Sequence, residues 1–219
     1  MFKERVRALG YLCAGFLSSG IASSLYVSCA LGADAFNLLT QGVSNTLGIQ
    51  VGNAFYLIQG ALLLFILAIR RRREVGLGTL FGTFLIGLVM NLWTLLLTPL
   101  LAAAGPGIRL CCLAAAPAFT GMGISLVKRS GYGLIPCDIL ALILHDRLHR
   151  LQFRTVRILC DGIFFLLGLL LGGTAGIGTV LSVVLTGPCI QLASSLLDRG
   201  ADRCRRVAPD AGCRALDNI

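Results

Sequence analysis

Residues 75–108 read VGLGTLFGTFLIGLVMNLWTLLLTPLLAAAGPGI, without one Asp, Glu, Lys or Arg. A helix needs about 20 mostly apolar residues to cross a bilayer, so this run is long enough to cross once and leave a turn. Three more long charge-free runs cover residues 8–33, 35–69 and 162–197, and a shorter one covers 110–127. No soluble core requires runs of this length. The pattern predicts an integral membrane protein built from helices.

The composition of the 219 residues supports the same class. Apolar residues make up 56% of the chain and charged residues 13%, against about 25% charged in soluble domains. The net charge of +9 could indicate a nucleic-acid-binding protein. However, the basic residues form short clusters between apolar runs, as in cytoplasmic loops of membrane proteins. We therefore expect no nucleic acid and name as partners the lipid bilayer and, at the cytoplasmic face, anionic headgroups.

The chain contains an internal duplication. Offsets of 100 or 101 residues align a set of identical or similar residues, which are Gly76-Leu77-Gly78-Thr79 with Gly176-Ile177-Gly178-Thr179, Asn91 with Gln191, Gly20 with Gly121, Ser24 with Ser125, and Asn37 with Asp138. This alignment predicts two copies, residues 8–98 and 109–197. They lie in two membrane units, residues 1–98 and residues 99–219, the second with a short basic tail.

Each copy contains three long apolar segments and one short segment. The long ones lie near residues 8–30, 52–70, 77–98, 109–128, 155–172 and 177–197. The short ones, near residues 35–48 and 136–150, have about 15 residues, too few at 1.5 Å per residue to cross a 30 Å core. We expect an all-α membrane protein with six transmembrane helices and two short re-entrant or interfacial helices.

The basic residues predict the orientation. If only the long segments cross, 18 of the 19 basic residues lie on one side, and Arg109 alone lies opposite. The positive-inside rule makes that side cytoplasmic, together with both termini. An eight-span arrangement would put Arg70–Arg73 outside. Each copy then has three crossings, so the second copy is inverted relative to the first, as in secondary transporters.

The order of these motifs resembles the YczE/YyaS/YitT family of bacterial multi-pass membrane proteins. The features are a Gly-rich first helix, a G-x-x-P-x-D start to the short helix, and G-x-G-T opening the last helix, in two copies. The second copy keeps Gly133, Pro136 and Asp138, whereas the first has Ala35 and Asn37 in the Pro and Asp places. The resemblance covers about residues 8–197. It implies the architecture and a location in the inner (plasma) membrane, with no substrate or catalytic residue.

The G-x-G-T motifs are candidate binding elements. A helix that opens after a tight glycine turn presents free N–H groups to an anion. The alternative is that glycine allows close helix packing, and this interpretation is preferred. The residues concerned are Gly76, Gly78 and Thr79, and Gly176, Gly178 and Thr179.

Polar residues also line the short helices. Asn37, Gln41 and Ser44 share one helical face, as do Asp138, His145 and His149. Such groups face a cavity or a partner at membrane depth, although Asn37 and Asp138 also stand where a helix N-cap is expected.

Three more positions complete the candidates. Asp161 lies four residues after Arg157, which suggests an ion pair, or alternatively a proton or cation site. Asn91 and Gln191 could hydrogen-bond across the repeat interface. His145 and His149 have a metal-ligand spacing but lack a third ligand, so no metal and no cofactor is predicted.

Enzyme motifs are absent, and we expect no enzyme. The first functional hypothesis is a small-solute secondary transporter or permease, with its site between the halves at Asn37 and Asp138. The alternative is a non-transporting regulatory or scaffold protein. A transporter should line a midplane cavity with these polar groups, whereas a scaffold should bond them to each other or to backbone.

Overall fold

The computed structural model describes residues 2–69, 76–132, 135–148 and 152–207, and these residues form eight α-helices. The helices are α1 (Phe2–Cys29), α2 (Ala35–Leu47), α3 (Val51–Ala68), α4 (Leu77–Ala103), α5 (Pro106–Ser130), α6 (Pro136–Arg147), α7 (Phe153–Leu170) and α8 (Ile177–Val207). The predictions about Arg70–Arg73, Gly133, His149 and Arg150 lie outside the described residues.

Five helices are long and apolar enough to cross a membrane. Their candidate spans are Val6–Cys29, Val51–Ala68, Gly78–Ala103, Pro106–Ser130 and Ile177–Asp198. The segment predicted as a sixth span, α7, has 18 residues but carries Arg154, Arg157 and Asp161 among them. The protein is thus an all-α membrane protein with five clear candidate spans.

The two short helices are confirmed as elements. α2 has 13 residues and ends at Gly48, whose φ of 64° is left-handed and suits glycine. α6 has 12 residues and begins with Pro136, which has no N–H to leave unpaired in the first turn. α6 ends at Arg147, earlier than the predicted residue 150. Neither helix is long enough to cross a bilayer.

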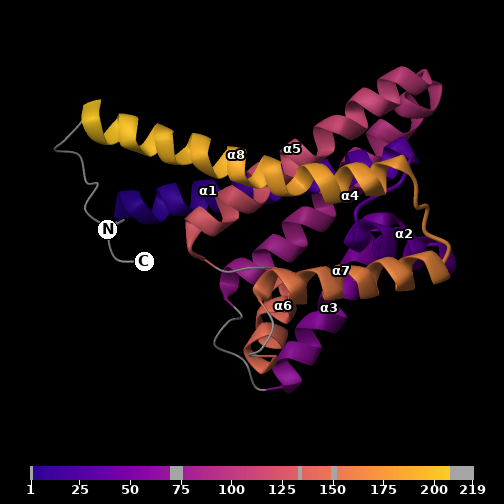
Figure 1. The fold of residues 1–219 in the computed structure, drawn as a ribbon, viewed down its shortest axis with the longest axis horizontal. Coiled ribbons are helices and arrows are strands. Elements are labelled where there is room, and N and C mark those ends of the chain that lie inside the picture. The colour runs from indigo at the N-terminus through magenta and orange to yellow at the C-terminus, as the bar shows by residue number, and fades with distance from the viewer. Residues whose placement is uncertain (1, 70–75, 133–134, 149–151, 208–219) are drawn as a thin grey trace.

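The helices form two groups (Figure 1). α1, α4, α5 and α8 lie in the upper part of the view and contact one another, while α2, α3, α6 and α7 pack together below. α3 and α4 contact each other and join the groups. Each group contains two helices from each half of the chain, so the halves interlock.

Contacts along the first group define helix directions. α1 and α4 run parallel, because the residue numbers of contacting pairs rise together along both helices. These pairs are Phe16 with Gly82, Gly20 with Val89, and Ser28 with Thr98. α5 and α8 run parallel by the same test, with Gly121 against Cys189, Ser125 against Ser194, and Arg129 against Asp198. α1 and α5 are antiparallel, since Gly15 lies against Val127 and Cys29 against Arg109.

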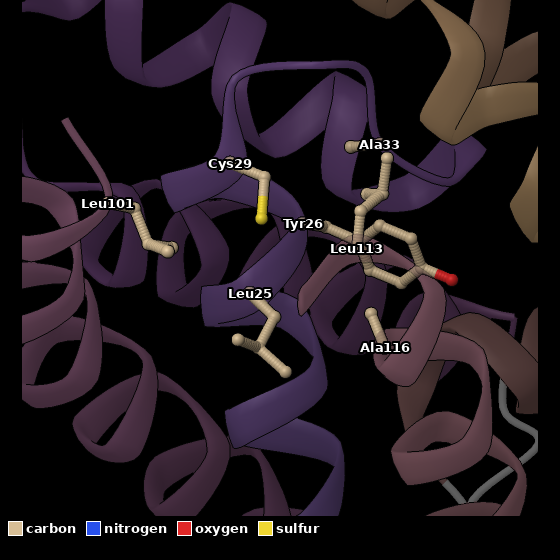
Figure 2. Packing of buried hydrophobic residues seen from close by; sticks show 7 residues of the cluster. All are labelled: Leu25, Tyr26, Cys29, Ala33, Leu101, Leu113 and Ala116. Atoms are coloured by element: carbon tan, nitrogen blue, oxygen red, sulfur yellow. The ribbon is translucent and has the colours of Figure 1, made fainter. Parts of the chain in front are cut away.

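An apolar cluster holds α1 to α4 and α5 (Figure 2). Its buried members are Leu25, Tyr26, Cys29, Ala33, Leu101, Leu113 and Ala116. The Tyr26 ring lies beside Leu113 and Ala116, and its hydroxyl points away from Leu25 and Leu101. This hydroxyl is buried and has no hydrogen-bond partner among the described residues.

Candidate functional site

All four helices of the second group meet in one apolar cluster. Its members are Leu39 of α2, Ile58 of α3, Cys137 and Ala141 of α6, and Val156, Cys160 and Phe164 of α7. The ring of Phe36, at the start of α2, packs edge-on against Phe55 of α3 and Phe164 of α7. The beginnings of α2 and α6 are thereby brought to the middle of α3 and α7.

Three charged residues directly follow members of this cluster in the sequence. Arg157 follows Val156, Asp138 follows Cys137, and Asp161 follows Cys160. The Arg157 Nη1 donates a hydrogen bond to Asp138 Oδ1. The Arg157 Nε lies 3.5 Å from Asp161 Oδ2. One guanidinium therefore serves two carboxylates, one on its own helix and one on α6.

The predicted ion pair between Arg157 and Asp161 is present, but it is the longer of the two. Asp138, predicted as a helix cap or a substrate contact, instead binds Arg157 across the α6–α7 interface. Opposite charges at such a depth reduce the cost of burying each one.

A third carboxyl approaches from the other short helix. Asp34 precedes α2 at its N-cap position, and the Asn37 Nδ2 donates a hydrogen bond to Asp34 Oδ1. Asp161 is close enough to Asp34 for their charges to interact. The polar residues at the starts of α2 and α6 thus converge on one place on α7.

Gln59 is a further polar group in this layer. It lies on α3 beside Ile58, is fully buried, and neither Oε1 nor Nε2 has a hydrogen-bond partner in the described part of the chain. An unpaired amide buried among apolar side chains costs free energy. Gln59 is therefore a group for which the described contacts provide no structural role.

The remaining polar residues of the α2 face bond to nearby backbone or side chains. Gln41 Oε1 accepts hydrogen bonds from the Thr174 N and Oγ1 at 3.0 and 2.7 Å. Ser44 Oγ donates to Ile49 O at 2.6 Å. On α6, His145 is half-buried. No group of three or more His, Cys, Asp or Glu in the described ranges is placed to hold a metal ion.

The G-x-G-T motifs lie at the two ends of the first helix group. A side chain at Gly78 would come within 2.5 Å of Tyr132 O, and one at Gly178 would collide with Gly32 O. Gly76 and Gly176 make similar approaches, to Tyr132 and Leu31. These glycines allow the backbone of each half to contact the loop of the other, which favours the packing interpretation.

The helix starts are also closed by hydrogen bonds. Gly178 N donates to Leu31 O at 3.0 Å, and Gly76 N and Gly176 N donate to Thr79 Oγ1 and Thr179 Oγ1, each at 3.4 Å. Thr79 and Thr179 therefore act within their own helix turns.

The expected bond between Asn91 and Gln191 is wrong. Asn91 Oδ1 accepts from Gly52 N at 2.8 Å, and Asn91 Nδ2 donates to Asn53 Oδ1 at 3.0 Å, so this amide caps the start of α3. Gln191 lies exposed on α8. The reason is that α4 and α8 each pack on the first helix of their own half.

Sequence reasoning missed Asp34 and Gln59 as site residues. Asp34 is the single charge that separates the apolar runs 8–33 and 35–69, so its position was a usable signal. Gln59 is a lone amide within the second of those runs. Both are polar groups that adjoin or interrupt apolar runs, and in membrane proteins such residues face partners or pathways.

Comparison with known proteins gives a family and two relatives. The family model DUF6198, a family of unknown function, matches residues 6–195. The uncharacterised protein YyaS of Bacillus subtilis is 29% identical over 194 residues, which cover 84% of this chain and 91% of YyaS. An uncharacterised protein of Haemophilus influenzae is 31% identical over 180 residues, covering 82% of this chain and 80% of that protein. No solved structure matches. The resemblance to YyaS is confirmed.

Proposed function

This chain belongs to DUF6198, a family of unknown function, and we propose that it is a small-solute secondary transporter or permease of the bacterial inner membrane. The observation that carries the proposal is the charged cluster formed by Arg157, Asp138 and Asp161, with Asp34 beside it, where the two short helices begin. Ionisable groups within a membrane bundle are costly and mark solute or ion pathways. Discontinuous helices beginning at such a cluster are a feature of transporter sites.

The helix directions support six crossings, with α7 as the sixth. α5 ends beside the start of α4, and α8 starts beside the end of α1. Because α1 and α4 are parallel, these two places lie at opposite ends of the first group. The chain must therefore pass from one end to the other between α1 and α4, and again between α5 and α8. The long helices in these two connections are α3 and α7. Arg157 and Asp161 of α7 pair with each other, and Arg157 also pairs with Asp138, so these charges have partners within the protein.

Equivalent contacts in the two halves support an inverted repeat. Ser24 Oγ approaches Met90 O at 3.4 Å, and its counterpart Ser125 Oγ approaches Ile190 O at 3.3 Å. Gly20 packs on α4 as Gly121 packs on α8. Since α1 and α5 are antiparallel, the two halves would be related by a rotation of about 180° around an axis in the membrane plane.

We place both termini in the cytoplasm, on the side that holds the basic clusters. Lys128, Arg129 and Arg147 belong to that side and lie at the ends of α5 and α6. Anionic headgroups of the cytoplasmic leaflet would be their partners.

A second candidate function is a non-transporting regulatory or scaffold protein. The observation that favours it is that Asn37, Asp138 and Asn91 all bond to other protein groups. That arrangement was expected of a scaffold. It leaves Gln59 unexplained, and it does not account for the cost of a charged cluster.

Uptake by reconstituted vesicles tests the proposal. The purified protein is placed in lipid vesicles and screened against a panel of labelled small solutes, and Asp138→Asn and Asn37→Ala are then compared with wild type. Asp198→Asn is the matched control, because Asp198 is exposed at the end of the apolar span of α8 and pairs with Arg129. We expect uptake of one solute class, reduced at least tenfold in both site variants and unchanged in the control. Wild-type rates in both site variants would remove the cluster from the pathway, and no uptake of any solute would favour the scaffold.

A further inference from the structure

We propose that Asp34 and Asn37 form a proton-binding site, in which a proton held by the Asp34 carboxyl completes a pair of hydrogen bonds with the Asn37 amide. The proposal concerns these two residues at the start of α2, where that helix meets α7. A proton site at this position does not follow from the transport hypothesis itself.

The proposal rests on a buried oxygen atom, Asn37 Oδ1, that has no hydrogen-bond donor among the described residues. The Asn37 side chain is only 6% exposed. Its Nδ2 donates to Asp34 Oδ1, while its Oδ1 is buried and has no donor among the described residues. Nδ2 and Oδ1 belong to one planar amide, so the unpaired oxygen lies on the group that already contacts the Asp34 carboxyl. A buried acceptor without a donor is unfavourable.

Protonation of Asp34 supplies the missing donor. An ionised carboxylate only accepts hydrogen bonds, so it can pair with the Asn37 NH₂ but not with the Asn37 carbonyl. A protonated carboxyl has one O–H, which can donate to Asn37 Oδ1 while its other oxygen accepts from Nδ2. The carboxylate gains one proton from water and loses its charge, and both amide atoms are then paired.

Surrounding charges also favour the neutral carboxyl. The guanidinium of Arg157 is bound to Asp138 and Asp161, so Asp34 has the Asn37 amide as its described polar partner. The groups that face Asp34 from neighbouring helices are Asp161 of α7 and the Tyr26 hydroxyl of α1. Neither carries a positive charge.

Burial raises the pKa of the Asp34 carboxyl, and the Asp161 charge acts in the same direction, while hydrogen bonds from the Asn37 side chain and from the Asn37 and Asp34 backbone oppose them. A metal ion is a poorer occupant than a proton, because no three carboxylates, histidines or cysteines of the described residues are grouped to hold one. A proton needs only the single carboxyl.

The consequence for function rests on the proposed transport activity. If the protein carries a solute, a proton on Asp34 makes protons the coupling ion, because gain and loss of that proton change the charge beside Asp161 and Arg157. If it carries none, the proton site remains and acts on stability alone.

Infrared difference spectroscopy of the full chain in lipid vesicles tests the site directly. We expect wild type at neutral pH to give the C=O band of a protonated, hydrogen-bonded carboxyl, which disappears on titration to alkaline pH. The band should be lost in Asp34→Asn, kept in Asp198→Asn, and shifted to higher frequency in Asn37→Leu, where the carboxyl loses its amide partner. An ionised Asp34 at neutral pH, in wild type and in Asn37→Leu alike, overturns the proposal.

Thermal unfolding in detergent gives a second reading that needs no solute. The unfolded chain releases the Asp34 proton at its ordinary pKa, whereas the folded chain holds it to higher pH. Stability should therefore fall as pH rises between these two values, and this fall should be missing in Asp34→Asn. The same slope in Asp34→Asn as in wild type contradicts the site. Because neither experiment measures uptake, a failure here is separate from a failure of transport.

Discussion

Arg157 is the residue on which the charge balance of the site depends. Its guanidinium contacts both Asp138 and Asp161. The exposed fraction of the side chain is 34% for Arg157, 21% for Asp138 and 41% for Asp161. We propose α7 as a membrane crossing, and in that arrangement these charges would depend on each other more than at a soluble surface.

We predict that Arg157→Leu destabilises the protein by about 3 kcal/mol, because two carboxylates are left without their cation. Denaturation of the purified protein in mixed micelles measures the loss. Arg129→Leu is the matched control: it breaks the pair with Asp198, whose side chain is 72% exposed, and should cost less than about 1 kcal/mol. Replacing Asp138 by Leu together with Arg157 should recover part of the loss. Equal losses in the two single variants would mean that the cluster has no special role in stability.

At the scale of elements, the backbone contacts between the two halves depend on glycine. The start of α8 rests on the loop after α1, with Gly178 against Gly32 O, and the start of α4 rests on Tyr132 after α5. Glycine has no Cβ, so backbone can approach backbone there.

We predict that Gly178→Ala destabilises the protein by about 1–3 kcal/mol, because the added methyl group overfills the contact. Gly187→Ala on the same helix is the control, since nothing lies within 4 Å of a Cβ at that position. Alanine is the better helix former by up to about 1 kcal/mol, so the control should be neutral or slightly stabilising. The melting temperatures of both variants in detergent provide the comparison. A neutral Gly178→Ala would show that the contact relaxes without cost.

Most elements were predictable from the sequence, since charge-free runs and their spacing define helices locally. The end of α4 was placed too early, because apolar residues extend the helix through Pro99 to Ala103. The start of α5 was placed too late, since the helix begins at Pro106 rather than near residue 109. The partners of the site residues were less accessible. Asn91 and Arg157 each bond to the preceding helix, at Gly52 of α3 and Asp138 of α6. The repeat alone predicted a different partner for Asn91.

At the scale of the whole molecule, one basic residue is exceptional: in the proposed topology Arg109 alone lies opposite the other 18. Arg109 donates hydrogen bonds from Nε to Leu101 O at 2.7 Å and from Nη2 to Ala102 O at 2.8 Å. These are carbonyls of the last turn of α4, where the backbone supplies few N–H partners; Leu101 O also accepts from Ala104 N at 3.2 Å. Arg109 is thus used as a cap for α4, which explains why it lies apart from the other basic residues.

We predict that reporter enzymes fused at Arg72 and Ala201 are active in the cytoplasm, and that one fused at Ala104 is active outside. The order follows from six crossings and the positive-inside rule. Paired reporters, one active on each side, give complementary signals at each position and control for expression. An external signal at Arg72, or an external signal at Ala201, would remove α3 or α7 from the set of crossings.

The contact between the start of α8 and the loop after α1 joins two segments that are synthesised far apart in time. Gly178 N donates to Leu31 O. The ribosome must add the 146 residues 32–177 after Leu31 before it adds Gly178. During that interval the Leu31 carbonyl lacks its final hydrogen-bond donor. The hydrogen bonding of the first-half loop is therefore complete only after the second half has been made.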